Sequence, residues 1–478
     1  MKKLKRMATL LFAAMLSPNT MQAAPAAPVY AAQPAQQTTA GASAPTYEYK
    51  LDNGMRVIVK PDHRAPVVVS MVWYRVGSMD EYSGHTGVAH VLEHMMFKGT
   101  HDVPPGQFSR LIAVAGGRDN AFTSRDATAY FQTLQKSQLP LALRLEADRM
   151  ANLNLSADEF AREIQVVMEE RRWRVDDQAR SLLFESLMAT VFKANPYRRP
   201  VIGWMNDLQH MSAEDARAFY ERWYVPDNAL LVIVGDVQPE EVLALAKQYF
   251  GPVKSRPLPE RKPQTEPEQR GIRRITVKAP AELPYVVMAY RAPQLEDPEK
   301  DREPYALEML AYVLDGNPAA RLNRNLVRSE RIASAVGAGY DSVGRGPALF
   351  QLHGTPTTGK TAAQLEQALR REVQRVVDEG VSAEELTRVK AQAIAAHVYE
   401  RDSMFYQARQ IGALEIAGIS HRYVDLFLDK LKAVTAEEVQ AVARKYLIDD
   451  GLTVAYLDPQ PLPANHAAPP PGGLDHVR

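Results

Sequence analysis

The 478-residue sequence contains no cysteine, which excludes disulfide bonds, thiolate metal ligands and lipid attachment through a cysteine. Long hydrophobic runs are also missing, because no stretch reaches the roughly 20 apolar residues of a membrane-spanning helix. There is no excess of charge of either sign, with 57 basic and 57 acidic side chains. This balance argues against the positively charged surface of a nucleic-acid-binding protein.

The first 24 residues have the pattern of an export signal. Four basic residues at positions 2–6 precede an apolar stretch at 7–16, and small residues follow at 23–27. About ten apolar residues are too few to span a bilayer, so a signal peptide is favoured over a membrane anchor. Its removal would leave 53 basic against 57 acidic side chains, a net charge of −4. We therefore expect a periplasmic or secreted protein without a stable membrane anchor.

The rest of the chain divides into two folded parts of similar length. Five prolines among charged residues mark a linker between them. The predicted divisions are a signal peptide at 1–24, a disordered spacer at 25–46, a first domain at 47–251, a proline-rich linker at 252–272, a second domain at 273–458 and a disordered tail at 459–478.

Both folded parts end in the same pattern. Ala213 and Ala436 each open an acidic helix start, and Trp223 and Tyr446 each close that helix before a turn and an apolar strand. Both pairs are separated by 223 residues. Many unrelated helices precede strands in this way, but the shared spacing favours a duplication. The sequence thus predicts an α+β fold of two homologous domains.

The sharpest chemical pattern is His90-Val91-Leu92-Glu93-His94, within a helix expected over residues 86–97. Positions i and i+4 share a helix face, so both imidazoles can reach one cation. Glu93 can point at a metal-bound water without binding the metal itself. This order is the inverted zinc-peptidase motif. Two surface histidines are the alternative, but they leave the apolar residues around them unexplained.

A third metal ligand is expected on a helix predicted over residues 156–173, which starts with a capping box. Glu163 and Glu170 lie seven residues apart, close to two helical turns, and valines lie between them on the same face. Buried carboxylates need a cation or strong hydrogen bonds. Glu170 is therefore predicted as the ligand and Glu163 as the residue that orients a ligand, while Glu169 points to solvent.

At these residues the sequence resembles the pitrilysin/insulysin superfamily, and in particular its short branch that includes mitochondrial processing peptidase. The resemblance covers residues 47–457 and rests on the motif within 84–100 and on the 75 residues between His94 and Glu170. It implies one zinc ion per chain and two homologous domains, each an antiparallel-rich sheet packed against helices. It also implies hydrolysis of unfolded peptides inside a chamber.

Two further stretches resemble the family. Residues 116–124 match its edge strand beside the zinc, and residues 195–200 match a loop of its first domain. The resemblance implies that the edge strand binds the substrate backbone as an added β-strand. The residues concerned are Asn120, Ala121, Phe122 and Thr123. A turn followed by an ordinary strand is the alternative for this stretch.

One position departs from the family. The family places an Arg and a Tyr seven residues apart in the second half, to hold substrate and to stabilise the oxyanion. Here the Arg is Arg328, but Ala335 occupies the place of the Tyr. Losing one oxyanion donor commonly costs a factor of ~10²–10³ in rate. We therefore expect a homologous subunit, in a heterodimer or a homodimer, to supply the missing pair, unless Tyr340 substitutes.

The sequence thus predicts a zinc metalloendopeptidase in which Glu93 is the general base on a zinc-bound water. The first alternative is a non-catalytic peptide-binding or structural subunit of a pitrilysin-like complex, although such subunits usually lack part of the motif that is complete here. The second is an unrelated exported metal-binding protein, which would need neither Glu93 nor a peptide-binding strand.

Overall fold

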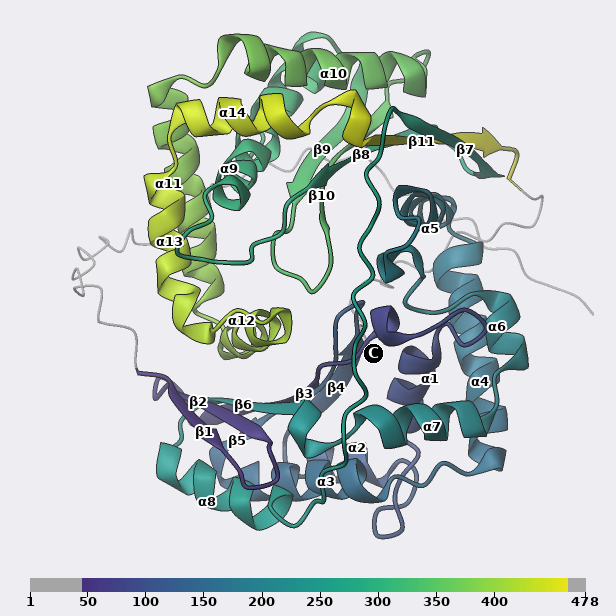
Figure 1. Ribbon diagram of the computed structural model, residues 1–478, viewed down its shortest axis with the longest axis vertical. Coiled ribbons are helices and arrows are strands. Elements are labelled where there is room, and N and C mark those ends of the chain that lie inside the picture. The colour runs from purple at the N-terminus through teal and green to yellow at the C-terminus, as the bar shows by residue number, and fades with distance from the viewer. Residues whose placement is uncertain (1–44, 463–478) are drawn as a thin grey trace, which may run out of the picture. The chain divides into compact units, whose positions relative to one another are not determined.

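The structure, a computed structural model, describes residues 45–462 and builds them around two β-sheets flanked by helices (Figure 1). The predicted α+β class is therefore confirmed. The predicted signal peptide, most of the predicted spacer and residues 463–478 of the predicted tail lie outside the described residues.

The first sheet has six strands in the order β1-β2-β6-β3-β5-β4. They are β1 (Tyr47–Lys50), β2 (Arg56–Pro61), β3 (Val67–Tyr74), β4 (Arg118–Thr123), β5 (Thr128–Gln135) and β6 (Ala229–Gly235). The helices of this half are α1 (Val88–Met95), α2 (Gln107–Val114), α3 (Leu139–Asn152), α4 (Ala157–Arg171), α5 (Ala179–Val191), α6 (Met205–His210), α7 (Ala213–Trp223) and α8 (Pro239–Phe250). Its short 3-10 or π turns include η1 (Ser78–Asp80), η3 (Arg172–Asp176), η4 (Pro196–Arg198) and η5 (Pro226–Asn228).

The second sheet has five strands in the order β7-β11-β8-β10-β9. They are β7 (Arg273–Pro280), β8 (Tyr285–Ala292), β9 (Ala333–Tyr340), β10 (Ala348–Pro356) and β11 (Leu452–Gln460). The helices of this half are α9 (Glu303–Asp315), α10 (Ala362–Glu379), α11 (Ala383–Glu400), α12 (Met404–Ala417), α13 (Val424–Ala433) and α14 (Ala436–Tyr446). Its short turns include η6 (Asn323–Ser329) and η8 (Asp449–Gly451).

The two sheets repeat one topology. The order β2-β6-β3-β5-β4 of the first matches β7-β11-β8-β10-β9 of the second. In each sheet the first of these pairs is parallel and the others are antiparallel. The bounds of α7 and η5 differ from those of α14 and η8 by the same 223 residues, and both helices start with a capping box. The predicted duplication is confirmed.

One helix of each half packs against the sheet of the other half. One face of the first sheet packs on its own helices, while α12 of the second half packs on the opposite face. In return, α5 of the first half covers the face of the second sheet that is opposite to that sheet's own helices. Figure 1 shows α12 against the lower sheet and α5 beside β7 and β11. Because both faces are covered, β3 and β6 are almost continuously apolar and buried rather than alternating.

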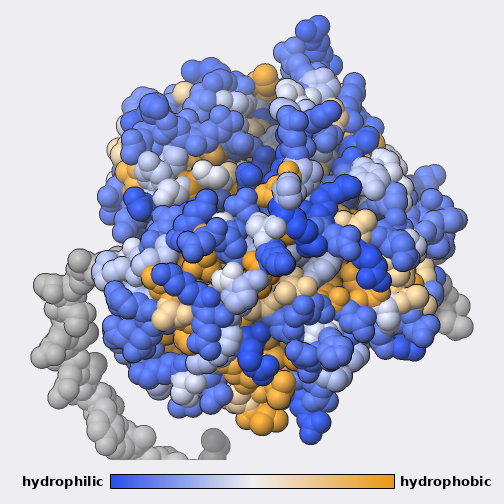
Figure 2. All heavy atoms as spheres, turned by 60° about the horizontal axis from the view of Figure 1, so that its bottom comes forward, coloured by the Kyte–Doolittle hydropathy of each residue, from blue (hydrophilic) through white to orange (hydrophobic). Residues whose placement is uncertain are grey.

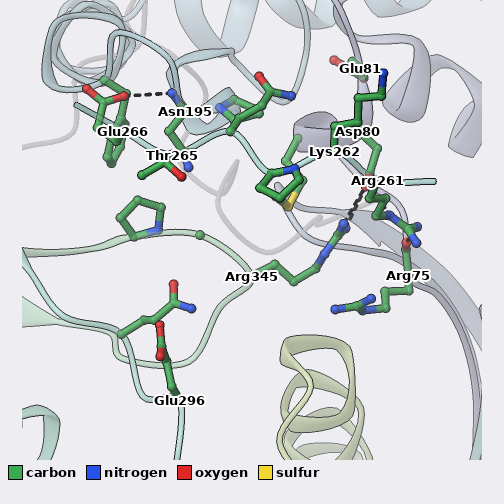
Figure 3. Close-up of a pocket in the computed structure, with 18 of the residues that line it drawn as sticks. Arg75, Asp80, Glu81, Asn195, Arg261, Lys262, Thr265, Glu266, Glu296 and Arg345 are labelled. Carbon is green, nitrogen blue, oxygen red and sulfur yellow. Dashed lines mark hydrogen bonds and ion pairs between the residues drawn. The ribbon is translucent and has the colours of Figure 1, made fainter.

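Residues 251–272 contain no helix or strand and pass between the two halves. Glu266 accepts the backbone amides of residues 193–195 and pairs with Arg291 at 2.7 Å. Arg261 pairs with Asp80 at 2.9 Å. Figure 3 shows Glu266 bonded to Asn195 and places Arg261 beside Asp80, on the wall of a cavity of about 950 Å³ that is lined by the linker and by both halves.

One predicted boundary and one predicted helix cap differ from the structure. Strand β11 continues to Gln460, so the predicted tail does not begin at residue 459. Pro459 fits there because the pairing of β11 with β8 ends at Leu457, which leaves only β7 beside it. Helix α4 starts beside Ser156, whose Oγ accepts the Glu159 amide, but the reciprocal bond of a capping box is absent because Glu159 pairs with Arg162.

In the described part of the chain, no helix combines the length and hydropathy that crossing a membrane requires. The face shown in Figure 2 carries hydrophobic residues in separate patches among hydrophilic ones. This face therefore has the mixed character of an ordinary protein surface.

Candidate metal and active site

Buried carboxylates set the start of α1. Glu81 accepts the amides of Gly87 and Ala89, each at 2.9 Å. Asp207 accepts the amide of Thr86 at 3.1 Å and its hydroxyl at 2.6 Å. With Thr86 held in this way and Gly87 at a φ of 90°, the helix begins at Val88, two residues later than predicted. Negative groups at a helix N-terminus also stabilise it electrostatically.

Three side chains from α1 and α4 converge. His90 and His94 come from α1 and Glu170 from α4, and their nearest ligand atoms all lie within 4.8 Å of one another. The Oε2 atom of Glu170 lies 3.2 Å from Nε2 of His94 and 3.8 Å from Nε2 of His90. This is the donor set that the sequence predicts, two imidazoles and one carboxylate.

The residues around this cluster orient it. Nδ1 of His94 lies 2.8 Å from Oε1 of Glu163, and Lys98 pairs with the other oxygen of that carboxylate. Although burial opposes the shift, the contacts with His94 and Lys98 lower the pKa of Glu163. Glu163 is therefore an ionised acceptor for the Nδ1 proton, which orients the ring so that Nε2 of His94 faces Glu170.

Glu170 is held ionised in the same way. Arg174, one turn further along in η3, pairs with Oε1 of Glu170 at 2.8 Å. Burial opposes ionisation, but the hydrogen bond from His94 and the charges of His90 and Arg174 lower the pKa of Glu170 to about 2. The bonds to Glu163 and Glu170 outweigh burial and raise the pKa of His94 to about 9. The same carboxylates would favour a divalent cation at this place.

Glu93 lies beside the cluster and is only 2% exposed. Burial raises the pKa of its carboxyl to about 7, partly offset by a 2.5 Å hydrogen bond from the hydroxyl of Thr123 to its Oε2 atom. A carboxylate with a pKa close to neutrality can both accept and release a proton at physiological pH.

The donor set fits zinc. Two imidazole nitrogens and one carboxylate are the ligands of one class of catalytic zinc site, in which a further position is left for water or substrate. The contact of His94 with Glu163 is the usual outer support for such a ligand. One ion per chain is what the residues can hold, because within the described residues this is the one group with ligand spacing.

The predicted substrate strand is β4, and it lies at the edge of the first sheet, bonded on one side to β5. Asn120 and Ala121 are central in this strand, and Ala121 is fully buried. Phe122 and Thr123 line a cavity of about 520 Å³ together with His90 and Glu93. The side chain of Thr123 also has a role that the sequence did not predict, because it holds Glu93.

The second-half residues do not join this cluster. Arg328 is exposed on η6, and within the described residues no hydrogen bond or ion pair connects it to the metal ligands. Ala335 is exposed on β9. Tyr340, the possible substitute, donates its hydroxyl to the carbonyl oxygen of Pro293 and lines a different cavity.

The sequence did not predict three supporting contacts, which are made by Lys98, Arg174 and the hydroxyl of Thr123. One of them carried a signal, because Arg174 follows Glu170 by four residues, and side chains at this spacing meet on a helix. Lys98 lies beyond the end of α1 and pairs with Glu163 of α4, a contact between distant segments without a local signal. The contact of Thr123 with Glu93 depends on the packing of β4 against α1 and has no local signal.

Two family models and several known proteins match most of this chain. Residues 56–204 match the family model described as Insulinase (Peptidase family M16), and residues 210–393 match the one described as Peptidase M16 inactive domain. The zinc protease PqqE of Helicobacter pylori is 31% identical over 421 residues, which cover 86% of this chain and 92% of that protein.

Solved structures are similar in fold. The crystal structure of a protease from Helicobacter pylori matches with a TM-score of 0.82 at 28% identity, over 87% of this chain and 100% of that one. The periplasmic protease PqqL from Escherichia coli matches with a TM-score of 0.75 at 21% identity. That match covers 88% of this chain but 48% of the other, so the same fold occurs there within a chain of about twice the length.

Proposed function

This chain belongs to peptidase family M16, the insulinase family, and on that premise we propose that it is a zinc-dependent endopeptidase acting on unfolded peptides. The observation that carries the proposal is the convergence of His90, His94 and Glu170 beside the buried carboxyl of Glu93. Relatives named zinc proteases support both the metal and the reaction class.

The residues of the chain divide the chemistry between them. His90, His94 and Glu170 would hold a zinc ion, which when bound polarises the scissile carbonyl and acidifies water. Glu93 accepts the proton of the attacking water and passes it to the leaving amine. Thr123 positions Glu93 for both transfers through its hydrogen bond.

The substrate is an extended peptide that adds to the free edge of β4. Backbone groups of an edge strand recognise other backbones with little demand on sequence. Asn120, Ala121, Phe122 and Thr123 belong to that edge strand, and the last two line the cavity beside Glu93. A folded protein offers few extended segments, so unfolded peptides are the substrate class that this arrangement favours.

A homologous subunit completes the enzyme. Ala335 cannot donate a hydrogen bond to an oxyanion, and the hydroxyl of Tyr340 is engaged by Pro293. We propose that the partner subunit, in a heterodimer or a homodimer, supplies the missing donor and closes a chamber over the site. The export signal predicted at residues 1–24 would bring the assembly to the periplasm or the exterior.

The test compares the parent chain with Glu93→Gln, measuring zinc content and hydrolysis of unfolded peptides, alone and with a companion subunit. We expect both proteins to bind about one zinc ion and the variant to lose a factor of ~10²–10⁴ in kcat. Glu169→Gln is the matched control, because Glu169 neighbours Glu170 but pairs with Arg172 at the surface. Zinc binding without hydrolysis under any condition would instead favour a non-catalytic subunit.

A further inference from the structure

The cavity beside Glu93 has an unusual charge composition. Its walls combine apolar side chains such as Phe122, Phe184 and Met188 with four arginines. The arginines are Arg125, Arg174, Arg198 and Arg199. Two carboxylates also line it: Glu93 in the reaction centre and Glu185, which Arg171 binds through two bonds of 2.8 and 3.0 Å. Arg174 pairs with Glu170 of the metal cluster, whereas no carboxylate of the described residues forms an ion pair with the other three arginines.

Arg125 is the most exceptional of the four. It lies in the turn between β4 and β5, and its buried Nε atom has no hydrogen-bond partner within residues 45–462. Its guanidinium lies 5.7 Å from the ring centroid of Tyr197, which holds the side chain in place. Burial lowers the pKa of Arg125. Arg125 as a whole is partly exposed, so its guanidinium reaches the cavity, where it has no carboxylate partner among the described residues.

The nearest acidic neighbours of Arg125 do not pair with it. Asp126 accepts the hydroxyl of Tyr197 at 2.5 Å, and no ion pair joins it to Arg125 among the described residues. Asp126 also lies on the wall of an adjoining cavity rather than of this one. Arg125 itself lines both cavities, at the point where they meet.

Arg198 and Arg199 add positive charge to another part of the cavity wall. Arg198 is half-buried in η4, and its guanidinium has no hydrogen bond or ion pair in the part of the chain that the structure describes. Arg199 donates to the carbonyl oxygen of Glu81, and its buried Nε atom has no partner within the described ranges. Burial, reinforced by the charge of Arg198, lowers the pKa of Arg199. These groups come from 195–200, the second stretch that resembles the family.

We propose that this pocket recognises a carboxylate of the substrate, either an Asp or Glu side chain close to the scissile bond or the free C-terminus of the peptide. The proposal rests on the proposed peptidase function and names the class of peptide that the site prefers. Arg125 forms the charge-assisted pair with the carboxylate, Arg198 strengthens it, and the apolar walls take up the carbon chain. The guanidinium fork matches a planar carboxylate, which makes the preference geometric as well as electrostatic.

The experiment uses the zinc-loaded full chain with Glu93→Gln, so that peptides bind without being cut. Fluorescence anisotropy gives Kd for one labelled unstructured peptide in four versions, which combine Glu or Gln at one internal position with a free or an amidated C-terminus. We expect at least one carboxylate to tighten binding about tenfold or more. Loss of the effect on Glu-to-Gln exchange identifies the side chain as its source, and loss on amidation identifies the terminus.

Variants of the chain then test whether Arg125 is the source of the preference for a carboxylate. Arg125→Met should reduce it to less than twofold while the Kd of the neutral peptide stays within twofold. Arg110→Met, an exposed arginine on α2, is the control and should keep the full preference. If Arg125→Met fails to fold, Arg198→Met at the half-buried position should still reduce the preference about threefold.

The proposal fails if no carboxylate improves binding, or if Arg125→Met weakens the neutral and acidic peptides equally. Its failure is distinct from failure of the proposed function. Hydrolysis by the parent chain without any carboxylate preference overturns this inference alone. Carboxylate-selective binding by a parent chain that never hydrolyses peptides overturns the peptidase assignment and leaves the inference standing.

Discussion

The guanidinium of Arg345 binds the carboxylate of Asp80 through two parallel hydrogen bonds, from Nη1 to Oδ2 at 2.7 Å and from Nη2 to Oδ1 at 2.9 Å. Arg345 belongs to the loop between β9 and β10, and Asp80 to η1 of the other half. Both side chains are at most 5% exposed. Figure 3 shows Arg345 reaching towards Asp80. Arg261 of the linker binds the same carboxylate, so one buried anion connects three segments of the chain.

Replacing Arg345 should therefore destabilise the whole described fold. Arg345→Met leaves Asp80 buried with Arg261 as its remaining ionic partner, and we expect a loss of about 2–4 kcal/mol in the free energy of unfolding. Urea denaturation followed by circular dichroism measures it. Arg270→Met, which removes an exposed pair with Glu268, should change stability by less than about 0.5 kcal/mol. A double-mutant cycle with Asp80→Asn should recover part of the loss; strict additivity would contradict the coupling.

Acid should weaken the attachment of α12 through Glu415. Its carboxylate binds Arg56 of β2 at 2.7 Å and His421 at 2.7 Å. Burial opposes ionisation, but these bonds lower the pKa of Glu415 from 4.5 to about 2. Because the folded state then binds fewer protons than the unfolded state, the contribution is complete above about pH 5 and is lost as pH falls towards 2. It amounts to about 3 kcal/mol.

The corresponding measurement is the unfolding free energy of the parent and of Glu415→Gln between pH 3 and 7. The parent should be more stable at neutral pH, and the difference should shrink steadily as the pH is lowered. Glu268→Gln, at an exposed ion pair, should show no such trend. A stability difference that is constant with pH would disprove the assigned role.

Glu163 should tune metal affinity without being a ligand. Glu163→Gln removes the charge that holds Nδ1 of His94, so we expect zinc affinity to fall by about 10- to 100-fold. Competition with a fluorescent chelator measures it. Glu170→Gln should be more severe, since it removes a predicted ligand, and Glu169→Gln should behave like the parent. Equal zinc affinities of the parent and Glu163→Gln would refute the role of Glu163 in orienting His94.

Thr123 should set the proton affinity of Glu93. Its hydroxyl stabilises the ionised carboxylate, so Thr123→Val should raise the pKa of Glu93 and move the acid limb of the kcat/KM profile to higher pH by about one unit. Thr123→Ser keeps the donor and should retain the parent profile. A fall in rate without any displacement of that limb would point to a purely structural role.

Local patterns made part of the structure predictable. His90 and His94 share a helix face by spacing alone, and Glu163 and Glu170 share another because seven residues are nearly two turns. The shared 223-residue offset made the duplication predictable, because the repeated elements have the same lengths. Each of these inferences depends on periodicity within one element or on comparison of two similar stretches.

Contacts between distant segments were not predictable. The helix α5 buries Leu183, Leu187 and Val191 against the second sheet, but its sequence gives no sign of which sheet it meets. Glu170 could be assigned as a ligand because carboxylates rarely lie on a buried face, whereas the isolation of Arg125 becomes visible only when β4 and η4 are brought together. Burial of a charge without a partner is a property of the folded chain.

The crossed placement of α5 and α12 has a consequence for how the polypeptide can be divided. A fragment ending after residue 251 keeps α5 but loses the cover of its own sheet, and the complementary fragment loses α5 in the same way. Each piece alone would therefore display an uncovered apolar sheet face and tend to aggregate. A protease cut within 251–272 in the intact protein should nevertheless leave the two pieces associated, because α5 and α12 remain packed on the sheets of the opposite pieces.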